Sequence, residues 1–338
     1  MDGSHVERKE YFMKDSLALG IDLGGSKIYA VVTGEGNRVL SSAKITTPSS
    51  ESPQKIIKSM VETGEEALGK LGKKLGDVSC IGAAFPSPVD PATGDCTFAT
   101  NLGEHQFSAR KIFRDLLKRE VYLGNDGDLG TLAEFRYHAD PEEQSLIGFF
   151  IGTGLGGGVI VNGELLQGNC GLAAELGHMI IHRGGRRCGC GHRGCIEAYC
   201  SKLAFVKALQ KECRRRCTHT TLPPDKFNLK TTNIKSKYLL KAYAEGDGIV
   251  REVIDHGSRM LGIAAASACA VVAPERIVIG GGVGVSLGQY IMPVFRESFE
   301  KHLFGLDPSR IQLSLSAYGD DAVAVGATIL ARKKSTGK

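Results

Sequence analysis

The amino-acid sequence predicts an α/β protein built from two related halves. Its 338 residues are too many for one typical domain and suit two domains, each able to bury a core. Hydrophobic residues make up 42% and charged residues 23%, which is ordinary for a globular protein. Segments of strand character alternate with segments of helical period, and one pattern of strands and glycine turns occurs twice.

The first half begins with three short strands joined by tight turns, in the stretch "LALGIDLGGSKIYAVVTGEGNRVLSSAKI" from residue 17 to 45. A helix is expected over 53–71, because apolar side chains recur there near helical spacing, at Ile56, Ile57, Met60, Val61 and Leu68. A buried strand, "SCIGAAFPSPVD", ends in a loop with two prolines, and a helix over 109–119 leads to the strand "VYLGND". This alternation is typical of α/β folds.

The second half repeats the opening pattern. The stretch "SLIGFFIGTGLGGGVIVNGELLQG" can be laid over residues 17–45, with Ile21–Gly25 opposite Ile151–Leu155. A repeat of this length suggests two related halves that face each other, with a glycine turn from each half pointing into a shared cleft. We expect a small α/β domain over 17–126 with a C-terminal helix over 321–334, and a large α/β domain over 127–320.

A third glycine cluster occurs in "RIVIGGGVGVS", where a strand over 276–279 runs into three glycines and then a helix. The nearly all-apolar segment before it, 250–272, predicts a long buried helix. The basic segment 211–237 contains a Pro-Pro pair and is interpreted as a solvated loop with some helix. Its single aromatic residue, Phe227, is not part of a pattern of aromatics interleaved with the basic residues, so we expect no nucleic-acid partner.

Charge and segment lengths exclude further classes. A net charge of +5 suits an anionic small molecule such as a nucleotide. No apolar run approaches the roughly 18 residues that a membrane span requires, so no membrane partner is expected. The start "MDGSHVERKEYFMKDS" has no apolar core like that of a signal peptide, which predicts a cytoplasmic protein.

The first glycine turn carries the groups that bind phosphate. A carboxylate, two glycines, a hydroxyl and an ammonium follow one another, at Asp22, Gly24, Gly25, Ser26 and Lys27. Glycines let backbone N–H groups approach phosphate oxygens, and the hydroxyl and ammonium add donors. Phosphate would repel the carboxylate of Asp22 unless a cation stands between them, which implies Mg²⁺ held through water. A plain hairpin turn with a surface lysine is the alternative.

The second glycine turn, made by Gly152, Thr153 and Gly154, favours a phosphate clamp with two sides. The chain contains no G-x-x-x-x-G-K-[ST] sequence and therefore no Walker A loop. The stretch "GLGGG" is followed by a strand, "VIVNG", and not by the helix that a dinucleotide-binding fingerprint requires.

Four of the ten cysteines lie close together within residues 188–200. Because the sequence shows no secretion signal, we do not expect them to form disulfides. One imidazole and three thiols form a standard set for structural zinc, at His178, Cys188, Cys190 and Cys195. His182 and His192 are rival ligands, and Cys200 is a spare thiol. Glu175 and Glu197 flank the set, so a bound metal would fix two carboxylates close together, as in a site that accepts hydrogen bonds from vicinal sugar hydroxyls. Two surface glutamates are the alternative.

Taken together, these motifs resemble the successive motifs of the ROK family (repressors, open reading frames and sugar kinases), from about residue 17 to 332. The segments are Asp22–Lys27, Gly152–Gly158, Glu175–His178, Cys188–Glu197 and Gly280–Val283. The resemblance implies an actin-like, ribonuclease-H-like duplicated fold with ATP and a hexose in an interdomain cleft. A homodimer is expected as the assembly. It implies sugar-binding roles for Asn101, Asn125, Asp126, Glu175, His178 and Glu197. Asp126 falls on the catalytic base, and the adenosine-binding loop falls on Gly280, Gly281, Gly282 and Val283.

The implied reaction is ATP-dependent phosphorylation of a hexose at its C6 hydroxyl, with glucose the first expectation. Kinases of N-acetylmannosamine, N-acetylglucosamine or fructose share these motifs. A sugar-responsive repressor would need an N-terminal DNA-binding module, and only 16 residues precede "LALGID". Ser87 and Ala174 stand where glycines are usual, and Gly127-Asp128 replaces small or amide residues, which puts the preferred hexose in question.

Overall fold

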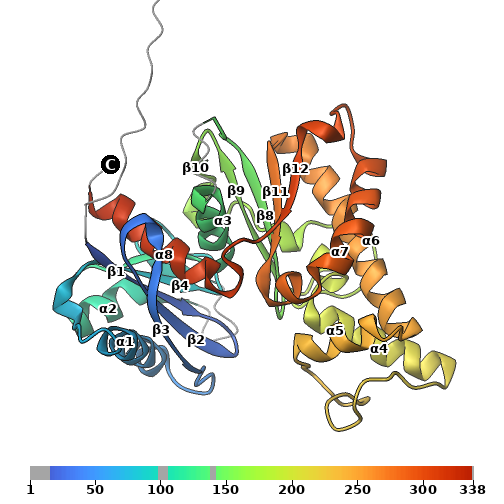
Figure 1. The fold of residues 1–338 in the computed structure, drawn as a ribbon, viewed down its shortest axis with the longest axis horizontal. Helices are drawn as coiled ribbons and strands as arrows, with labels where there is room; N and C mark the ends of the chain where they lie inside the picture. Colours follow the sequence, from blue (N-terminus) through green and yellow to red (C-terminus); the bar gives the residue numbers. More distant parts are fainter. Residues whose placement is uncertain (1–15, 98–105, 138–141, 337–338) are drawn as a thin grey trace, which may run out of the picture. The chain divides into compact units, whose positions relative to one another are not determined.

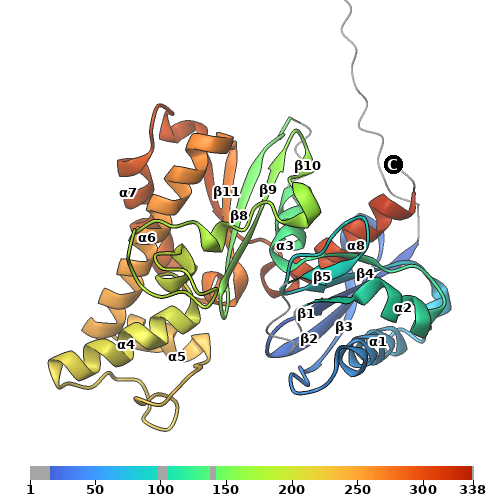
Figure 2. The same cartoon turned by 180° about the vertical axis from the view of Figure 1, so that it is seen from behind.

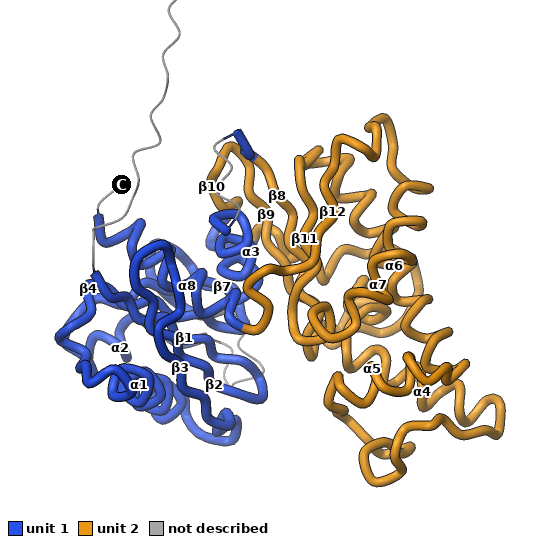
Figure 3. The backbone as a smooth tube through the Cα atoms, viewed as in Figure 1, with its two compact units in different colours: residues 1–144, 167–172, 321–338 blue, residues 145–166, 173–320 orange. Residues whose placement is uncertain are grey.

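The computed structural model describes residues 16–97, 106–137 and 142–336, which form two compact units (Figure 3). The first unit takes its described residues from 1–144, 167–172 and 321–338, and the second from 145–166 and 173–320. Each unit is built on one five-stranded mixed sheet. The domain boundary expected at residue 126 stays a prediction; helix α3 (Asp126–Tyr137), which begins there, belongs to the first unit.

The sheet of the first unit has the strand order β3-β2-β1-β4-β7. Strands β1, β2 and β3 form the expected antiparallel meander, and β4 and β7 run parallel to β1. The bounds are β1 (Leu17–Leu23), β2 (Lys27–Thr33), β3 (Val39–Thr46), β4 (Val78–Phe85) and β7 (Tyr122–Asn125). A separate two-stranded sheet joins β5 (Asp95–Thr97) to β6 (Gln106–Ser108).

Helices cover both faces of this sheet (Figure 1). Leu19 and Ile21 of β1 point to one face, where they pack with α1 (Pro53–Gly69) and α2 (Ala109–Leu117) in one apolar core. Gly20 of β1 points to the other face, where a Cβ would collide with a carbonyl oxygen of α8 (Ala322–Ser335). Glycine is therefore required where α8 lies directly on the strand backbone, and α3 packs beside α8.

The sheet of the second unit repeats the first, with the order β10-β9-β8-β11-β12 and the same pattern of antiparallel and parallel pairs. The bounds are β8 (Leu146–Ile151), β9 (Leu155–Val161), β10 (Glu164–Leu165), β11 (Arg276–Gly280) and β12 (Gln312–Leu315). The predicted duplication is confirmed. Its alignment is corrected by two residues, because Leu23, and not Ile21, ends the strand that corresponds to the one ending at Ile151.

Four helices belong to the second unit: α4 (Lys202–Arg216), α5 (Ser236–Ala244), α6 (Gly248–Val272) and α7 (Gly281–His302). Helices α6 and α7 lie side by side (Figure 1), and Gly262 of α6 has no room for a side chain because the α7 backbone at Phe295 and Phe299 lies against it. The predicted long helix is confirmed and begins two residues earlier than expected. Its last turn is not buried, since Val271 is 87% exposed.

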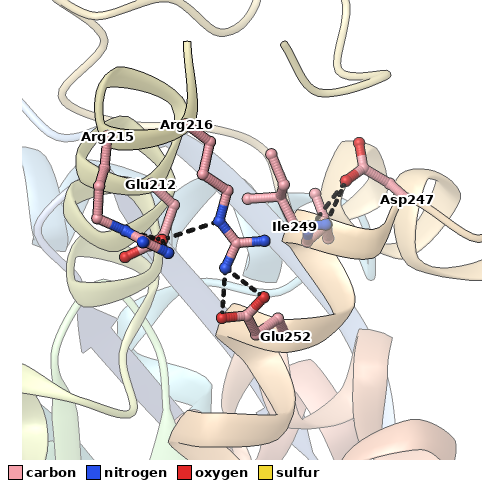
Figure 4. Close-up of polar contacts among 7 residues, drawn as sticks. Glu212, Arg215, Arg216, Asp247, Ile249 and Glu252 are labelled. Carbon is pink, nitrogen blue, oxygen red and sulfur yellow. Dashed lines mark hydrogen bonds and ion pairs between the residues drawn. The ribbon is translucent and has the colours of Figure 1, made fainter. Parts of the chain in front are cut away.

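The basic segment 211–237 is more ordered than the solvated loop that we expected. Residues 211–216 complete α4, and the loop after it buries Leu222, Phe227 and Ile234 in the core. In Figure 4, Arg216 lies between Glu212 of α4 and Glu252 of α6, with nitrogen–oxygen distances of 3.2 and 2.6 Å. Arg215 also bonds Glu212, at 2.7 Å, so Arg215 and Arg216 are both paired with neighbouring acids. Across the described ranges, no helix is long and apolar enough to cross a membrane.

Candidate functional site

The structure brings His178, Cys188, Cys190 and Cys195 together, with their ligand atoms all within 4.8 Å of one another. The Sγ atoms of Cys190 and Cys195 lie 3.7 Å apart, and Cys188 Sγ lies 3.8 Å from His178 Nδ1. Zinc–sulfur bonds of about 2.3 Å in a tetrahedron require sulfurs about 3.8 Å apart, whereas a disulfide requires about 2.05 Å. The donor set and its spacing therefore fit a tetrahedral zinc ion.

The rival ligands have other neighbours. His182 Nδ1 lies 3.2 Å from the hydroxyl of Tyr199, and His192 Nδ1 lies 3.6 Å from Cys190 Sγ without joining the group of four. Cys200 is fully buried, and burial raises the pKa of its thiol to about 12. Among the described residues, the geometry favours His178 as the imidazole ligand.

The charge state of these thiols would depend on a bound cation. Loss of hydration raises the pKa of Cys188 and Cys195 above the ordinary thiol value. Burial opposes ionisation of Cys190 as well, but hydrogen bonds from His192 and the neighbouring thiols lower its pKa to about 7. Two of three converging thiols would stay protonated without a cation, and a divalent metal reverses this by stabilising the thiolates.

Glycines and one tyrosine shape the metal loop, the segment 178–195 that carries the four ligands. Gly191 and Gly194 have φ angles of 94° and 90°, which few other residues adopt, so these two turns favour glycine. Tyr199 lies under the loop: its hydroxyl accepts a hydrogen bond from the Arg186 N–H at 2.9 Å, and a Cβ on Gly185 would collide with it. Sequence reasoning missed Tyr199, because nothing in its spacing distinguishes it from a core aromatic residue.

The metal loop lies beside the second glycine turn. In Figure 2 the yellow-green segment between β10 and α4 runs alongside β9 and α6, and its short helical turns 176–178 and 196–198 contact these elements. Gly177 has no side chain because the Leu155 carbonyl lies against it. Glu197 Oε2 accepts a hydrogen bond from the Leu155 N–H at 3.1 Å, and its Oε1 lies 3.3 Å from Cys188 Sγ.

Helix α4 holds the other side of this turn. The backbone N–H groups of Lys202 and Leu203, at the start of α4, donate to the carbonyls of Gly152 and Thr153 at 3.1 and 3.2 Å. These two donors were not foreseen, because backbone contacts 50 residues apart leave no pattern in the sequence. The turn is therefore held from both α4 and Glu197.

The two predicted sugar-binding glutamates lie close enough to interact. Loss of hydration raises the pKa of Glu175, the neighbouring His178 lowers it, and the negative charge of Glu197 raises it further. Ala174, directly before Glu175, has a φ angle of 59°, in the left-handed region that favours glycine. The departure from the usual glycine at this position therefore places a methyl group in a strained backbone conformation.

The third glycine cluster also meets the second turn. Gly281 has a φ angle of 77°, and a Cβ there would lie 2.6 Å from the Ile151 carbonyl oxygen at the end of β8. The start of α7 is thus packed against the strand that leads into residues 152–154. Val283 is 1% exposed over the whole residue, backbone included, so its expected contact with a nucleotide stays a prediction.

In the first unit, the residues predicted to bind ligands lie at the carboxyl ends of the parallel strands β1 and β7. Asp22 is level with Ala84 of β4, and Ala84 with Gly124 of β7, so Asp22 and the end of β7 lie about two strand spacings, or ~10 Å, apart. Asn125 Oδ1 caps α3 by accepting from the N–H groups of Gly127 and Asp128 at 2.9 and 3.2 Å. Asn101 lies outside the described residues.

Asp126 is the first residue of α3, and its Oδ1 accepts from the Gly127 N–H at 2.8 Å. A helix N-terminus favours a negative charge, so this position suits a carboxylate. Because Asn125 and Asp126 both bond the first turn of α3, the direction of the Asp126 side chain is fixed by the helix that it begins.

The first glycine turn connects β1 to β2. The hydroxyl of Thr47 donates to the Gly24 carbonyl at 2.7 Å, and Lys27 Nζ lies 5.2 Å from the ring centre of Tyr29. A Cβ on Gly25 would meet nothing within 4 Å, and its φ is not in the left-handed region. The protein's own packing does not require glycine there, whereas close approach of a ligand to the backbone would.

Comparison with known proteins gives close matches in length and fold. A glucokinase of Halalkalibacterium halodurans is 26% identical over 324 residues, covering 95% of this chain and 97% of that protein. An N-acetylmannosamine kinase of Citrobacter koseri is 27% identical over 321 residues, covering 93% and 98%. The crystal structure of a ROK family glucokinase from Streptomyces griseus, in complex with glucose and AMPPNP, matches with a TM-score of 0.82 at 28% identity, covering 94% and 100%.

Two mixed sheets of identical strand order, each flanked by helices, define an actin-like α/β protein, as the sequence led us to expect. The model of the ROK family matches residues 18–334. The chain therefore belongs to the ROK family.

Proposed function

We propose that this protein transfers the γ-phosphoryl group of ATP to the C6 hydroxyl of a hexose, with glucose preferred. The observation that carries the proposal is the arrangement in the second unit. There one carboxylate, Glu197, bonds the glycine turn at Leu155 and contacts the metal cluster at Cys188. A sugar-binding carboxylate held against a phosphate-binding turn is what a sugar kinase needs, because the chemistry depends on positioning and charge neutralisation. The similarity to glucokinases supports the same reaction.

In this proposal Asp126 is the catalytic base. It accepts the proton of the C6 hydroxyl while that oxygen attacks the γ-phosphorus in line and ADP leaves. The hydrogen bond from the Gly127 N–H to Oδ1 holds the carboxylate at the start of α3, so its direction does not depend on a bound ligand. Asn125, which caps the same helix, and Asn101 are assigned to the sugar by the family resemblance.

Glu175, His178 and Glu197 are proposed to bind the sugar hydroxyls near C1 to C3. Carboxylates accept hydrogen bonds from vicinal hydroxyls. His178 Nδ1 faces the thiols, so Nε2 is the ring nitrogen that would donate to the sugar. A zinc ion in the cluster would act structurally, because it would fix the loop that carries these side chains.

The nucleotide is assigned to the three glycine clusters. Backbone N–H groups and side-chain donors of 24–27 and 152–154 would bind phosphate oxygens, and residues 280–283 would bind the adenosine. Asp22 would hold Mg²⁺ through water, and that ion would supply charge neutralisation for the phosphates.

A kinase of 2-acetamido sugars is the second candidate, favoured by the similarity to an N-acetylmannosamine kinase. Ala174 argues against it. The methyl group adds bulk beside Glu175, where an acetamido group would need space, and a mismatch of this kind is worth ~1–3 kcal/mol, or roughly 10- to 200-fold.

A coupled assay of ADP release over a panel of hexoses and acetamido-hexoses tests the proposal. We expect sugar-dependent release, with kcat/KM for glucose at least about tenfold above that for N-acetylmannosamine and N-acetylglucosamine. A kcat/KM for an acetamido sugar equal to or above that for glucose would replace glucose as the assigned substrate. The absence of turnover with every sugar would reject the proposal that the protein is a kinase.

A further inference from the structure

Glu197 touches two motifs that sequence reasoning assigned to different ligands. Its Oε2 accepts a hydrogen bond from the N–H of Leu155, 42 residues away, and its Oε1 lies 3.3 Å from Cys188 Sγ. Leu155 begins β9 and so ends the turn formed by residues 152–154. One carboxylate therefore joins the phosphate-binding turn to the loop that carries the sugar-binding groups.

Gly154 is the turn residue that this contact constrains. A Cβ at Gly154 would collide with Glu197 Oε2 and lie 3.3 Å from the carboxylate carbon. The φ angle of Gly154 is not in the left-handed region, so its backbone conformation alone does not call for glycine. Gly152, in the same turn, is different, since a Cβ there would meet only the Gly154 carbonyl oxygen, at 4.0 Å.

The rest of the turn is held without Glu197. The Gly152 N–H donates to the Gly154 carbonyl at 2.9 Å, and the first backbone N–H groups of α4 bond the carbonyls of Gly152 and Thr153. The end of the turn differs because the Leu155 N–H is bonded by a side chain. The last donor of the turn is therefore positioned by two contacts, the pairing of Leu155 with Ile151 of β8 and the bond to the Glu197 carboxylate.

We infer that Glu197 couples hexose binding to phosphate binding at the turn 152–154. The inference rests on the proposed function, in which Glu197 accepts a sugar hydroxyl and the turn contacts the nucleotide phosphates. A hexose that fixes the carboxylate also fixes the Leu155 N–H, so the first ligand orders groups that the second ligand needs. The coupling is reciprocal, because a change in either affinity caused by the other ligand must be equal in both directions.

The first test changes the turn and measures the sugar. Gly154→Ala displaces the Glu197 carboxylate from the Leu155 N–H and should raise the Kd of D-glucose at least about tenfold in calorimetry without nucleotide. Gly152→Ala is the matched control, since it adds the same methyl group to the same turn where there is room. Its glucose Kd should stay within about twofold of wild type.

The second test changes the glutamate and measures the nucleotide. Glu197→Ala removes the acceptor of the Leu155 N–H and should weaken binding of AMPPNP, without sugar, about fivefold or more. Glu197→Gln, whose amide oxygen can accept the same hydrogen bond, should restore most of the loss. Glu175→Ala is the control: no hydrogen bond joins Glu175 to the turn in the described part of the chain, so its AMPPNP Kd should change by less than about twofold.

Unchanged glucose affinity in Gly154→Ala, or unchanged AMPPNP affinity in Glu197→Ala, would overturn the coupling and leave the kinase proposal standing. A wild-type protein that binds neither ligand would instead overturn the proposed function and this inference with it. Zinc content and thermal unfolding are measured for each variant. The two tests use different variants, so one that loses its fold leaves the other decisive.

Discussion

The Sγ atoms of Cys190 and Cys195 lie 3.7 Å apart, close to the sulfur–sulfur distance in a tetrahedral zinc site and far from that of a disulfide. We expect one zinc ion per chain in freshly purified, unchelated protein. Cys190→Ala should lose most of the metal and weaken glucose binding, and should lower the melting temperature by more than about 5 °C, because the ion closes the loop that carries the glutamates.

Cys217→Ser is the control for this prediction, since Cys217 is an exposed thiol outside the cluster. It should keep both the metal and the melting temperature. Metal analysis that finds no zinc in the wild-type protein would contradict the assignment of the four ligands.

Asp126→Asn separates catalysis from binding. The amide oxygen of asparagine can still accept from the Gly127 N–H, so the start of α3 should keep its structure. Without the carboxylate, the C6 hydroxyl has no proton acceptor, and kcat should fall roughly 10²-fold or more while the glucose Kd changes by less than about threefold. Steady-state kinetics and calorimetry on the same preparation check both values. Near-normal turnover would show that another group is the base.

Ala174→Gly tests the strained residue beside Glu175. A left-handed alanine costs ~1–2 kcal/mol, and the greater chain entropy of glycine offsets ~0.5–1 kcal/mol of the relief. We expect the free energy of unfolding to rise by up to about 1 kcal/mol in urea titration. Removal of the methyl group should also lower the ratio of kcat/KM for glucose to kcat/KM for N-acetylmannosamine. An unchanged ratio would show that Ala174 does not determine which substrate is preferred.

Asp247 joins the loop after α4 to the start of α6. Its Oδ1 caps α6 by accepting from the N–H groups of Ile249 and Val250 at 3.0 Å (Figure 4). Its Oδ2 accepts from the N–H of Thr221 at 2.6 Å. Asp247→Ala should lower the free energy of unfolding by about 2–3 kcal/mol, because a buried cap and a loop contact are lost together.

Asp225→Ala serves as the control for Asp247, since its side chain is 67% exposed and pairs only with the adjacent Lys226 among the described ion pairs. It should change the free energy of unfolding by less than about 0.5 kcal/mol. Equal losses in the two variants, measured by denaturant titration, would refute the role given to Asp247.

Most of the strands and helices that were predicted correctly were predicted from local sequence patterns. Alternating and helical spacing of apolar residues gave the strands and the helices α1, α2 and α6 within a few residues, because these periods follow from backbone geometry. The cluster of His178 with three cysteines could be predicted because ligands on one short loop have little freedom to separate.

Contacts between distant residues could not be predicted in this way. The hydroxyl of Tyr29 donates to Asp321 at 2.6 Å across 292 residues, and neither residue carries a local signal of the other. The bond between Glu197 and the Leu155 N–H has the same character. The burial of Leu222 and Phe227 in a basic segment was also missed, because three consecutive arginines before them suggest solvent. The ion pairs that Arg215 and Arg216 form with acidic side chains are seen only in the structure.

The most direct test of a hexose kinase is the product itself. Wild-type protein with ATP, Mg²⁺ and D-glucose is followed by ³¹P NMR, which separates ATP, ADP, inorganic phosphate and phosphorylated sugar. The proposal predicts equal amounts of ADP and glucose 6-phosphate, with no inorganic phosphate above the level seen without enzyme. ADP that appears only with inorganic phosphate, or no consumption of ATP with glucose or any other hexose, would contradict it.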